Sequence, residues 1–244
     1  MPFNAINSLR EYCGMGVEDQ IPDAWFKELS SQNTITDNKL VISERNILEV
    51  GFGKGSLLKR FNNSGKNSGL YGVDASQNNF RYAQTQLKLN AQLTLADIST
   101  DRLPYPDGHF DTIIMLEVLE HIMSPMHAML EIKRVLKADG IFIFSWPEER
   151  LISGIGKEEN QANRKYETGF HAFPYPGLFR YDYMRVFFNQ LYFKIIDEEK
   201  REYHIYLKML NKKVNRPEIL DVVNGDYDTN KLYGDIRTMP KIVI

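Results

Sequence analysis

The segment from Asn46 to Gly55 constrains the fold of this chain more than any other. It reads Asn-Ile-Leu-Glu-Val-Gly-Phe-Gly-Lys-Gly, so an apolar strand runs directly into three alternating glycines. Glycine adopts unusual backbone angles, and because it has no Cβ atom, a ligand can approach the main chain closely. Residues 56–61 can then begin a helix whose free N–H groups face that ligand. The pattern predicts a strand, a ligand-binding turn and a helix of an α/β protein.

The spacing of the glycines separates two classes of nucleotide-like ligand. A dinucleotide-binding turn reads G-x-G-x-x-G or G-x-G-x-x-A, whereas here Gly55 comes one residue early and Ser56 occupies the last position. Glu49 stands just before Gly51 and Gly53, and its carboxylate would repel a pyrophosphate but attract a cation. The turn therefore favours a cationic ligand, such as a sulfonium that carries an α-amino group. A tight turn that holds no ligand is the alternative.

Acidic residues recur at the ends of three later apolar segments. These are residues 70–74 with Asp74, residues 92–98 with Asp97, and residues 108–117 with Glu117. Asp74 lies roughly twenty residues beyond the first glycine, where α/β nucleotide sites place the acceptor for the ribose hydroxyls. A single acid at such a place is usually a helix cap. Together with the first strand, which carries Glu49, four successive predicted strands have an acid at or near their end. This series predicts one shared site at one edge of a sheet.

At these residues the chain resembles the class I S-adenosylmethionine (SAM) methyltransferases, whose first motif is an acid, any residue and then G-x-G-x-G. The resemblance covers roughly residues 45–210. It implies an α/β, Rossmann-like fold with a mostly parallel seven-stranded sheet and an antiparallel C-terminal strand pair. It also implies SAM as the methyl donor and S-adenosylhomocysteine as the product. The implied cofactor-binding residues are Glu49, Gly51, Gly53, Gly55, Asp74, Ala75, Asp97, Ile98 and Glu117, with Asp97 at the adenine amino group and the N–H of Ile98 at the ring.

A second motif, Glu117-Val-Leu-Glu120-His121, directly follows the fourth predicted strand. If the segment enters a helical turn, positions 117, 120 and 121 share one face. Two carboxylates and an imidazole on one face suit a divalent cation such as Mg²⁺, and His171 could add a fourth ligand. The motif resembles those of ubiquinone-type O-methyltransferases and of small-RNA 2′-O-methyltransferases, in both of which a divalent ion is implicated. In the alternative, these side chains hydrogen-bond the loops or orient the methionine end of SAM.

The chemistry of methyl transfer narrows the function. An oxygen acceptor must lose its proton, and His121 and His171 are the predicted catalytic bases. The net charge of -2 and the pI of about 6.2 do not fit the clustered basic face of a nucleic-acid-binding protein. We therefore predict methylation at oxygen of a small molecule or a glycan precursor. The alternatives are a metal-dependent RNA 2′-O-methyltransferase and a SAM-binding module without catalytic activity.

The pattern divides the chain into three parts. Residues 1–45 form an N-terminal segment, in which residues 22–29 predict an amphipathic helix that covers the ligand. Residues 46–210 form the methyltransferase domain, and residues 147–177, rich in proline, glycine and aromatic residues, predict a lid or substrate-binding loop. Residues 211–244 form a tail, for which three alternatives stay open: it packs on the domain, on a second copy of the chain in a homodimer, or on neither.

Cys13 is the one cysteine of the sequence. It excludes an intramolecular disulfide and a thiolate metal cluster, and it favours a reducing compartment such as the cytoplasm. The sequence shows no signal-like apolar stretch at its start and no apolar run long enough to cross a bilayer. We therefore expect a cytoplasmic protein without a membrane span.

Overall fold

The computed structural model describes residues 21–31, 33–36, 39–42, 45–64, 69–122, 124–147, 180–201 and 204–212. Seven strands form one sheet in the order β5-β4-β3-β6-β7-β9-β8. They are β3 (Asn46–Val50), β4 (Gly69–Asp74), β5 (Gln92–Leu95), β6 (Phe110–Leu116), β7 (Leu136–Pro147), β8 (Phe193–Arg201) and β9 (His204–Asn211). The strand β9 runs antiparallel to both of its neighbours, whereas the pairs from β5 to β7 are parallel. The predicted mostly parallel sheet with an antiparallel C-terminal pair is confirmed.

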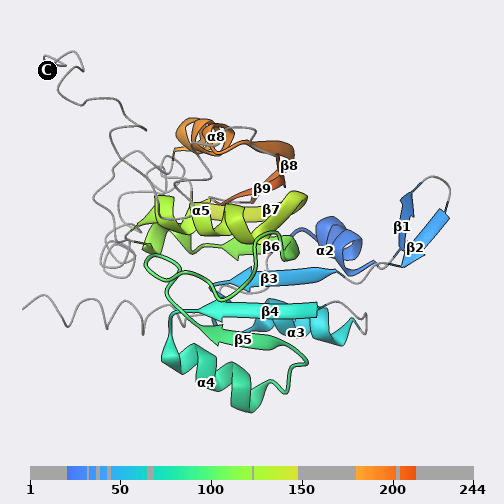
Figure 1. The fold of residues 1–244 in the computed structure, drawn as a ribbon, viewed down its shortest axis with the longest axis vertical. Coiled ribbons are helices and arrows are strands. Elements are labelled where there is room, and N and C mark those ends of the chain that lie inside the picture. The colour runs from blue at the N-terminus through green and yellow to red at the C-terminus, as the bar shows by residue number, and fades with distance from the viewer. Residues whose placement is uncertain are drawn as a thin grey trace, which may run out of the picture.

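Helices cover both faces of this sheet (Figure 1). They are α2 (Asp23–Ser30), α3 (Ser56–Asn63), α4 (Gln77–Gln86), α5 (Pro125–Val135) and α8 (Tyr181–Gln190), with a short 3-10 turn, η1 (Leu119–His121). Side chains alternate between the two faces along each strand. In β6, Ile113 and Met115 join the core under α5 and α8, whereas Ile114 joins the core under α2 and α3. Because the central strands are buried on both faces, they are mainly apolar rather than alternating.

The helix predicted at residues 22–29 is present as α2, but it does not cover the glycine turn. Its buried side chains, Trp25 and Leu29, pack against the sheet in the same core cluster as α3. The indole Nε1 of Trp25 donates a hydrogen bond of 2.8 Å to Asp197 on β8. Figure 1 shows α2 beside the beginning of β3, away from the end where the glycines follow. The apolar face of α2 therefore stabilises the sheet, and the prediction that it covers the ligand is wrong.

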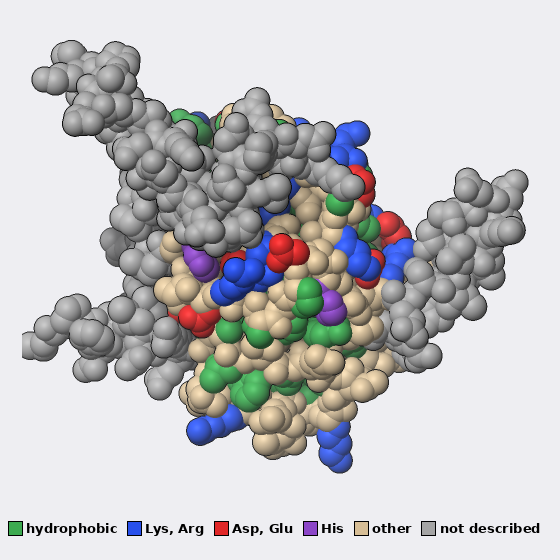
Figure 2. Space-filling view, viewed as in Figure 1, with side chains coloured by type: hydrophobic (Ala, Val, Ile, Leu, Met, Phe, Trp, Pro, Cys, Tyr) green, Lys and Arg blue, Asp and Glu red, His purple; other side chains and the backbone are tan. Residues whose placement is uncertain are grey.

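Several predicted segments lie partly or wholly outside the described residues. Pro147 ends β7, but the rest of the predicted substrate loop, including His171, is not described, and neither is the tail beyond residue 212. Two segments to which the sequence assigned no structure, β1 (Asn33–Thr36) and β2 (Lys39–Ile42), pair antiparallel in a separate two-stranded sheet. None of the described helices is long and apolar enough to cross a membrane. On the face shown in Figure 2, basic and acidic side chains lie close together rather than in separate fields.

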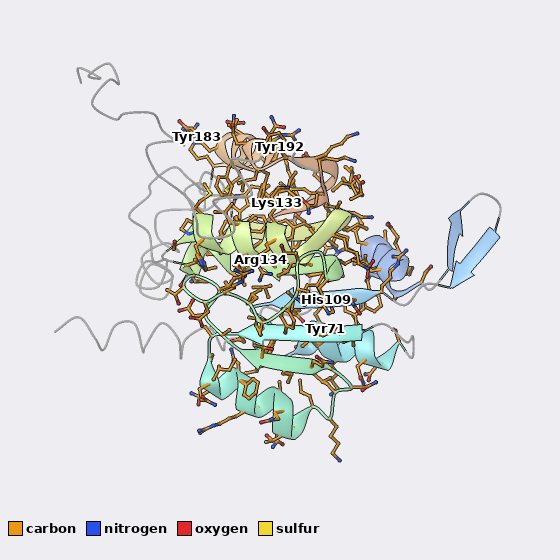
Figure 3. All side chains as sticks on the ribbon, viewed as in Figure 1. Tyr71, His109, Lys133, Arg134, Tyr183 and Tyr192 are labelled. Carbon is orange, nitrogen blue, oxygen red and sulfur yellow. The ribbon has the colours of Figure 1, made fainter. Side chains whose placement is uncertain are left out.

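A buried arginine fixes the segment that leads into β6. Arg134 on α5 (Figure 3) donates hydrogen bonds of 2.8 and 2.7 Å to Glu131 and one of 2.8 Å to Asp107. It also donates to the backbone carbonyls of Leu103 and Tyr105. The guanidinium, of which 1% is exposed, is thus fully paired, as a buried charge has to be. These bonds tie α5 to the entrance of β6, the strand that ends at Glu117.

Candidate functional site

The glycine turn has the backbone that the sequence predicts. Gly51, Gly53 and Gly55 have φ of +72°, +53° and +74°, in the left-handed region that side chains other than glycine rarely adopt. The N–H of Gly51 donates to the carbonyl of Val73 at 2.7 Å, which joins the turn to β4. A Cβ atom on Gly51 would lie 2.3 Å from Cγ2 of Val118. Both the backbone angle and the close neighbour therefore require glycine at position 51.

Asp74 stands at the end of β4 and binds the glycine turn directly. Its Oδ2 accepts a hydrogen bond of 2.8 Å from the N–H of Gly53, and its Oδ1 accepts one of 2.7 Å from the N–H of Ser76. Burial raises the pKa of Asp74, of which 3% is exposed. Half-buried Ala75 follows it in the connection to α4. A carboxylate has further lone pairs for a ligand. The ribose hydroxyls therefore remain predicted partners of Asp74, in addition to the N–H groups of Gly53 and Ser76.

Asp97 has a local role at the far end of the site. The strand β5 ends at Leu95, so Asp97 lies in the turn beyond it. Its Oδ1 accepts hydrogen bonds from the N–H and Oγ of Ser99 at 3.0 and 2.6 Å. The carbonyl of buried Ile98 lies 3.0 Å from Nδ1 of His127. Asp97 thus caps a turn, as an aspartate often does, and its contact with adenine remains a prediction.

The predicted metal face of Glu117, Glu120 and His121 is not formed. Glu117 has φ of +51° and precedes η1, which covers residues 119–121. The helical spacing rule needs a continuous helix, and a left-handed residue at position 117 interrupts it. Among the residues that the structure describes, no three His, Cys, Asp or Glu side chains form a group that could hold a metal ion. The described residues therefore do not show the predicted Mg²⁺ site, and its fourth predicted ligand, His171, lies outside them.

Glu117 is bound instead by two residues from the other half of the sheet. Its Oε1 accepts a hydrogen bond of 2.5 Å from Oγ of Ser145 on β7, and its Oε2 lies 3.3 Å from Nε2 of His204 on β9. Neither residue stands in a motif that predicts a site from the sequence. The register supplies the missing signal, because His204 pairs with Pro147 at the end of β7. The antiparallel strand β9 therefore begins at the edge where the parallel strands end.

Glu120 is the most deeply buried acid of the motif, with 3% of the residue exposed. Burial, and then the neighbouring carboxylate of Glu117, raise its pKa well above the ordinary value of 4.5. Within the part of the chain that the structure describes, its Oε2 has no hydrogen-bond partner. Nε2 of His121 lies 3.9 Å from its Oε1. Burial and the neighbouring carboxylate therefore both favour the protonated form of Glu120 over the charged form that a metal ligand needs.

We expect the substitution Glu120→Gln to flatten the pH dependence of stability. Above the ordinary pKa of 4.5, the unfolded chain releases the proton of Glu120 while the folded protein keeps it. Between this pH and the raised pKa of Glu120 in the folded protein, the folded state binds more protons than the unfolded state. The free energy of unfolding of the natural chain therefore falls as pH rises through this range. Urea unfolding at a series of pH values should show this decline in the natural chain and a smaller one in the variant. The control Glu199→Gln, on an exposed ion pair with Arg201, should keep the decline; equal slopes for Glu120→Gln and the natural chain would contradict the assignment.

Comparison with known proteins identifies the domain around this turn. Residues 48–144 match the family model described as a methyltransferase domain. The chain carries a class I SAM-dependent methyltransferase domain. The matched residues of this methyltransferase domain include the glycine turn, Asp74, Asp97 and the motif from Glu117 to His121. The sequence resemblance is therefore confirmed at the level of the family.

Relatives of the methyltransferase domain include two named O-methyltransferases. The malonyl-[acyl-carrier protein] O-methyltransferase of Geobacter sulfurreducens is 26% identical over 179 residues, which cover 70% of this chain and 64% of that protein. The ubiquinone biosynthesis O-methyltransferase of Nitrosomonas europaea is 25% identical over 152 residues, which cover 56% and 62%. A SAM-dependent methyltransferase of Aquifex aeolicus shares the fold, with a TM-score of 0.57 and 17% identity over 84% of this chain and 97% of that one. The chain spans less than two thirds of the length of the first curated relatives that it matches.

Proposed function

We propose that this protein is a SAM-dependent methyltransferase that methylates an oxygen atom of a small molecule or a glycan precursor. The observation that carries the proposal is the left-handed glycine turn tied to Asp74 by the 2.8 Å bond from Gly53, within a methyltransferase domain. Oxygen as the target is supported by the names of the two O-methyltransferase relatives. The acceptor class is supported by the net charge of -2 and the pI of about 6.2, which do not fit a nucleic-acid-binding protein.

The residues that would hold SAM lie along the ends of β3, β4, β5 and β6. In this proposal the turn from Gly51 to Gly55 receives the ligand through its backbone, and the other contacts are Asp74 and Ala75 at the ribose, Asp97 and Ile98 at the adenine, and Glu49 and Glu117 at the methionine end. SAM, when bound, supplies a methyl group on a positively charged sulfur that is already an activated leaving group. Two carboxylates at that end attract a cation. They would repel the pyrophosphate of a dinucleotide.

The contribution of the protein to methyl transfer is then orientation and the exclusion of water. An oxygen acceptor must also lose its proton to a base within hydrogen-bond reach. We propose His121, whose side chain is 23% exposed, and His171 for this role. The mixed charges in Figure 2 and the net charge of -2 favour a small acceptor over RNA.

Two further parts of the proposal rest on the sequence alone. The single cysteine, Cys13, supports a reducing compartment such as the cytoplasm. The tail predicted from the sequence, residues 211–244, is the segment that we assign to contact with a second copy of the chain. Sedimentation of the full chain would test the homodimer, since a monomer at high concentration would contradict it.

Calorimetric titration tests the cofactor. We expect S-adenosylhomocysteine to bind the purified full chain with a Kd of about 1 μM to 1 mM, a range typical of small substrates, and NAD not to bind. Binding of NAD alone would contradict the assignment of the glycine turn. Transfer of a labelled methyl group from SAM to a panel of hydroxyl acceptors, with and without His121→Ala, then tests catalysis. Binding without transfer to any acceptor would favour a SAM-binding module over an enzyme.

A further inference from the structure

We propose that Ser145 and His204 are positioning residues, which hold the carboxylate of Glu117 in place for the methionine end of bound SAM. The proposal deepens the proposed function and rests on it. It concerns residues outside the stretch 48–144 that matches the family model.

The backbone of Glu117 needs support from its surroundings. Its φ of +51° is rare for a residue with a side chain, and such a conformation persists only where neighbouring groups fix it. Ser145 binds Glu117 twice. The N–H of Glu117 donates to the carbonyl of Ser145 at 3.2 Å, and Oγ of Ser145 donates to Oε1 of Glu117 at 2.5 Å. Ser145 thus fixes both the main chain and the side chain of Glu117.

His204 contacts the second carboxylate oxygen of Glu117. Its Nε2 lies 3.3 Å from Oε2, and the side chains are 17% and 7% exposed. A neutral imidazole with its proton on Nε2 is a sufficient donor, so the role needs no change of charge. With one donor on each oxygen, the carboxylate of Glu117 has a defined orientation. Hydrogen bonds to a charged group are among the stronger ones in proteins.

The orientation matters because the segment that carries Glu117 adjoins the glycine turn. Val118, the next residue, comes within 2.3 Å of the position that a Cβ atom on Gly51 would occupy. The segment that carries Glu117 therefore adjoins the turn to which we assign the cofactor, and a carboxylate at this end of the sheet suits the α-amino group of the methionine end. A displaced Glu117 would lose that contact and leave the contacts of the nucleoside unchanged.

Two ligands that share the nucleoside separate this role from general loosening. S-adenosylhomocysteine has the amino-acid end, and 5′-methylthioadenosine lacks it. We expect Ser145→Ala and His204→Ala each to raise the Kd of S-adenosylhomocysteine roughly tenfold, because each removes one hydrogen bond to a charged group. The Kd of 5′-methylthioadenosine should stay unchanged. His204→Gln, which keeps a neutral donor, should recover most of the loss. Calorimetry on the full chain provides both constants.

The control is His109→Ala, which removes an imidazole beside Tyr71 and Tyr105, far from the glycine turn (Figure 3); both Kd values should be unchanged. Equal losses for the two ligands, or no loss for S-adenosylhomocysteine, would overturn the positioning role. A natural chain that binds neither ligand would instead contradict the proposed function. If Ser145→Ala does not fold, as a thermal melt would reveal, the comparison of His204→Ala with His204→Gln decides: failure of the glutamine variant to recover binding overturns the proposal.

Discussion

Asp74→Ala will lower both the stability of the fold and the affinity for S-adenosylhomocysteine. The substitution leaves the N–H groups of Gly53 and Ser76, now bound at 2.8 and 2.7 Å, without their acceptor. Two hydrogen bonds to a charged group contribute about 1.5–3 kcal/mol each, so we expect the free energy of unfolding to fall by about 3 kcal/mol or more. Because the glycine turn also loses its support, the Kd for S-adenosylhomocysteine should increase by a factor between several-fold and about a hundredfold. Urea unfolding and calorimetric titration measure the two effects.

Asp111→Ala is the matched control for Asp74→Ala. Asp111 also accepts a hydrogen bond from a backbone N–H, that of Asn46 at 2.9 Å, and pairs with Lys137. Asp111 lies near the beginning of β6 and binds the first residue of β3, at the edge of the sheet opposite to the site. We expect Asp111→Ala to lower stability without changing the Kd for S-adenosylhomocysteine. Natural stability and affinity in Asp74→Ala would show that this carboxylate supports neither the turn nor the ligand.

Gly51→Ala will disrupt the site through a single added methyl group. A left-handed residue other than glycine costs about 1–2 kcal/mol, and overpacking of a filled core costs about 1–3 kcal/mol more. The clash is with Cγ2 of Val118, 2.3 Å from the new Cβ atom. Since Val118 adjoins Glu117, we expect the Kd for S-adenosylhomocysteine to rise by more than about tenfold, the effect of 1.4 kcal/mol. Calorimetry and urea unfolding measure the losses.

Two variants divide this loss into its parts. Gly108 has φ of +61°, and a Cβ atom there would have 3.8 Å to its nearest neighbour, Cα of Lys137. Gly108→Ala should therefore lose about 1–2 kcal/mol of stability and no affinity. In Gly51→Ala combined with Val118→Ala, the clashing methyl groups are removed, and part of the affinity should return. If the double variant binds S-adenosylhomocysteine no more tightly than Gly51→Ala alone, the loss of affinity comes from the strained backbone and not from the clash with Val118.

The glycine turn could be predicted because its cause is local. An apolar run, three glycines at fixed spacing and the helix after them are neighbours in the sequence, and the structure has all three. The strands that end near Asp74 and Glu117 were found for the same reason. The direction of β9 was implied by the resemblance to the class I methyltransferases, whose sheet ends in an antiparallel pair.

The environment of Glu117 could not be predicted, because it depends on contacts between distant parts of the chain. Helical spacing placed Glu117, Glu120 and His121 on one face, but Ser145 holds Glu117 in a conformation that no helix contains. Ser145 itself reads as one polar residue in an apolar strand. In the sequence His204 is an ordinary strand residue. Its pairing with Pro147 places it at the edge of the sheet where the parallel strands end and the site lies.

The reversed direction of β9 makes the site sensitive to errors in the pairing of that strand. Successive residues of a strand face opposite sides, so a shift by one position exchanges their places. A slip of β9 against β7 would bring Ile205, now 1% exposed in the core, toward Glu117 and move the imidazole away. An insertion or deletion at residues 202–203, between β8 and β9, would therefore act on the carboxylate from across the sheet, with every residue of the glycine turn intact.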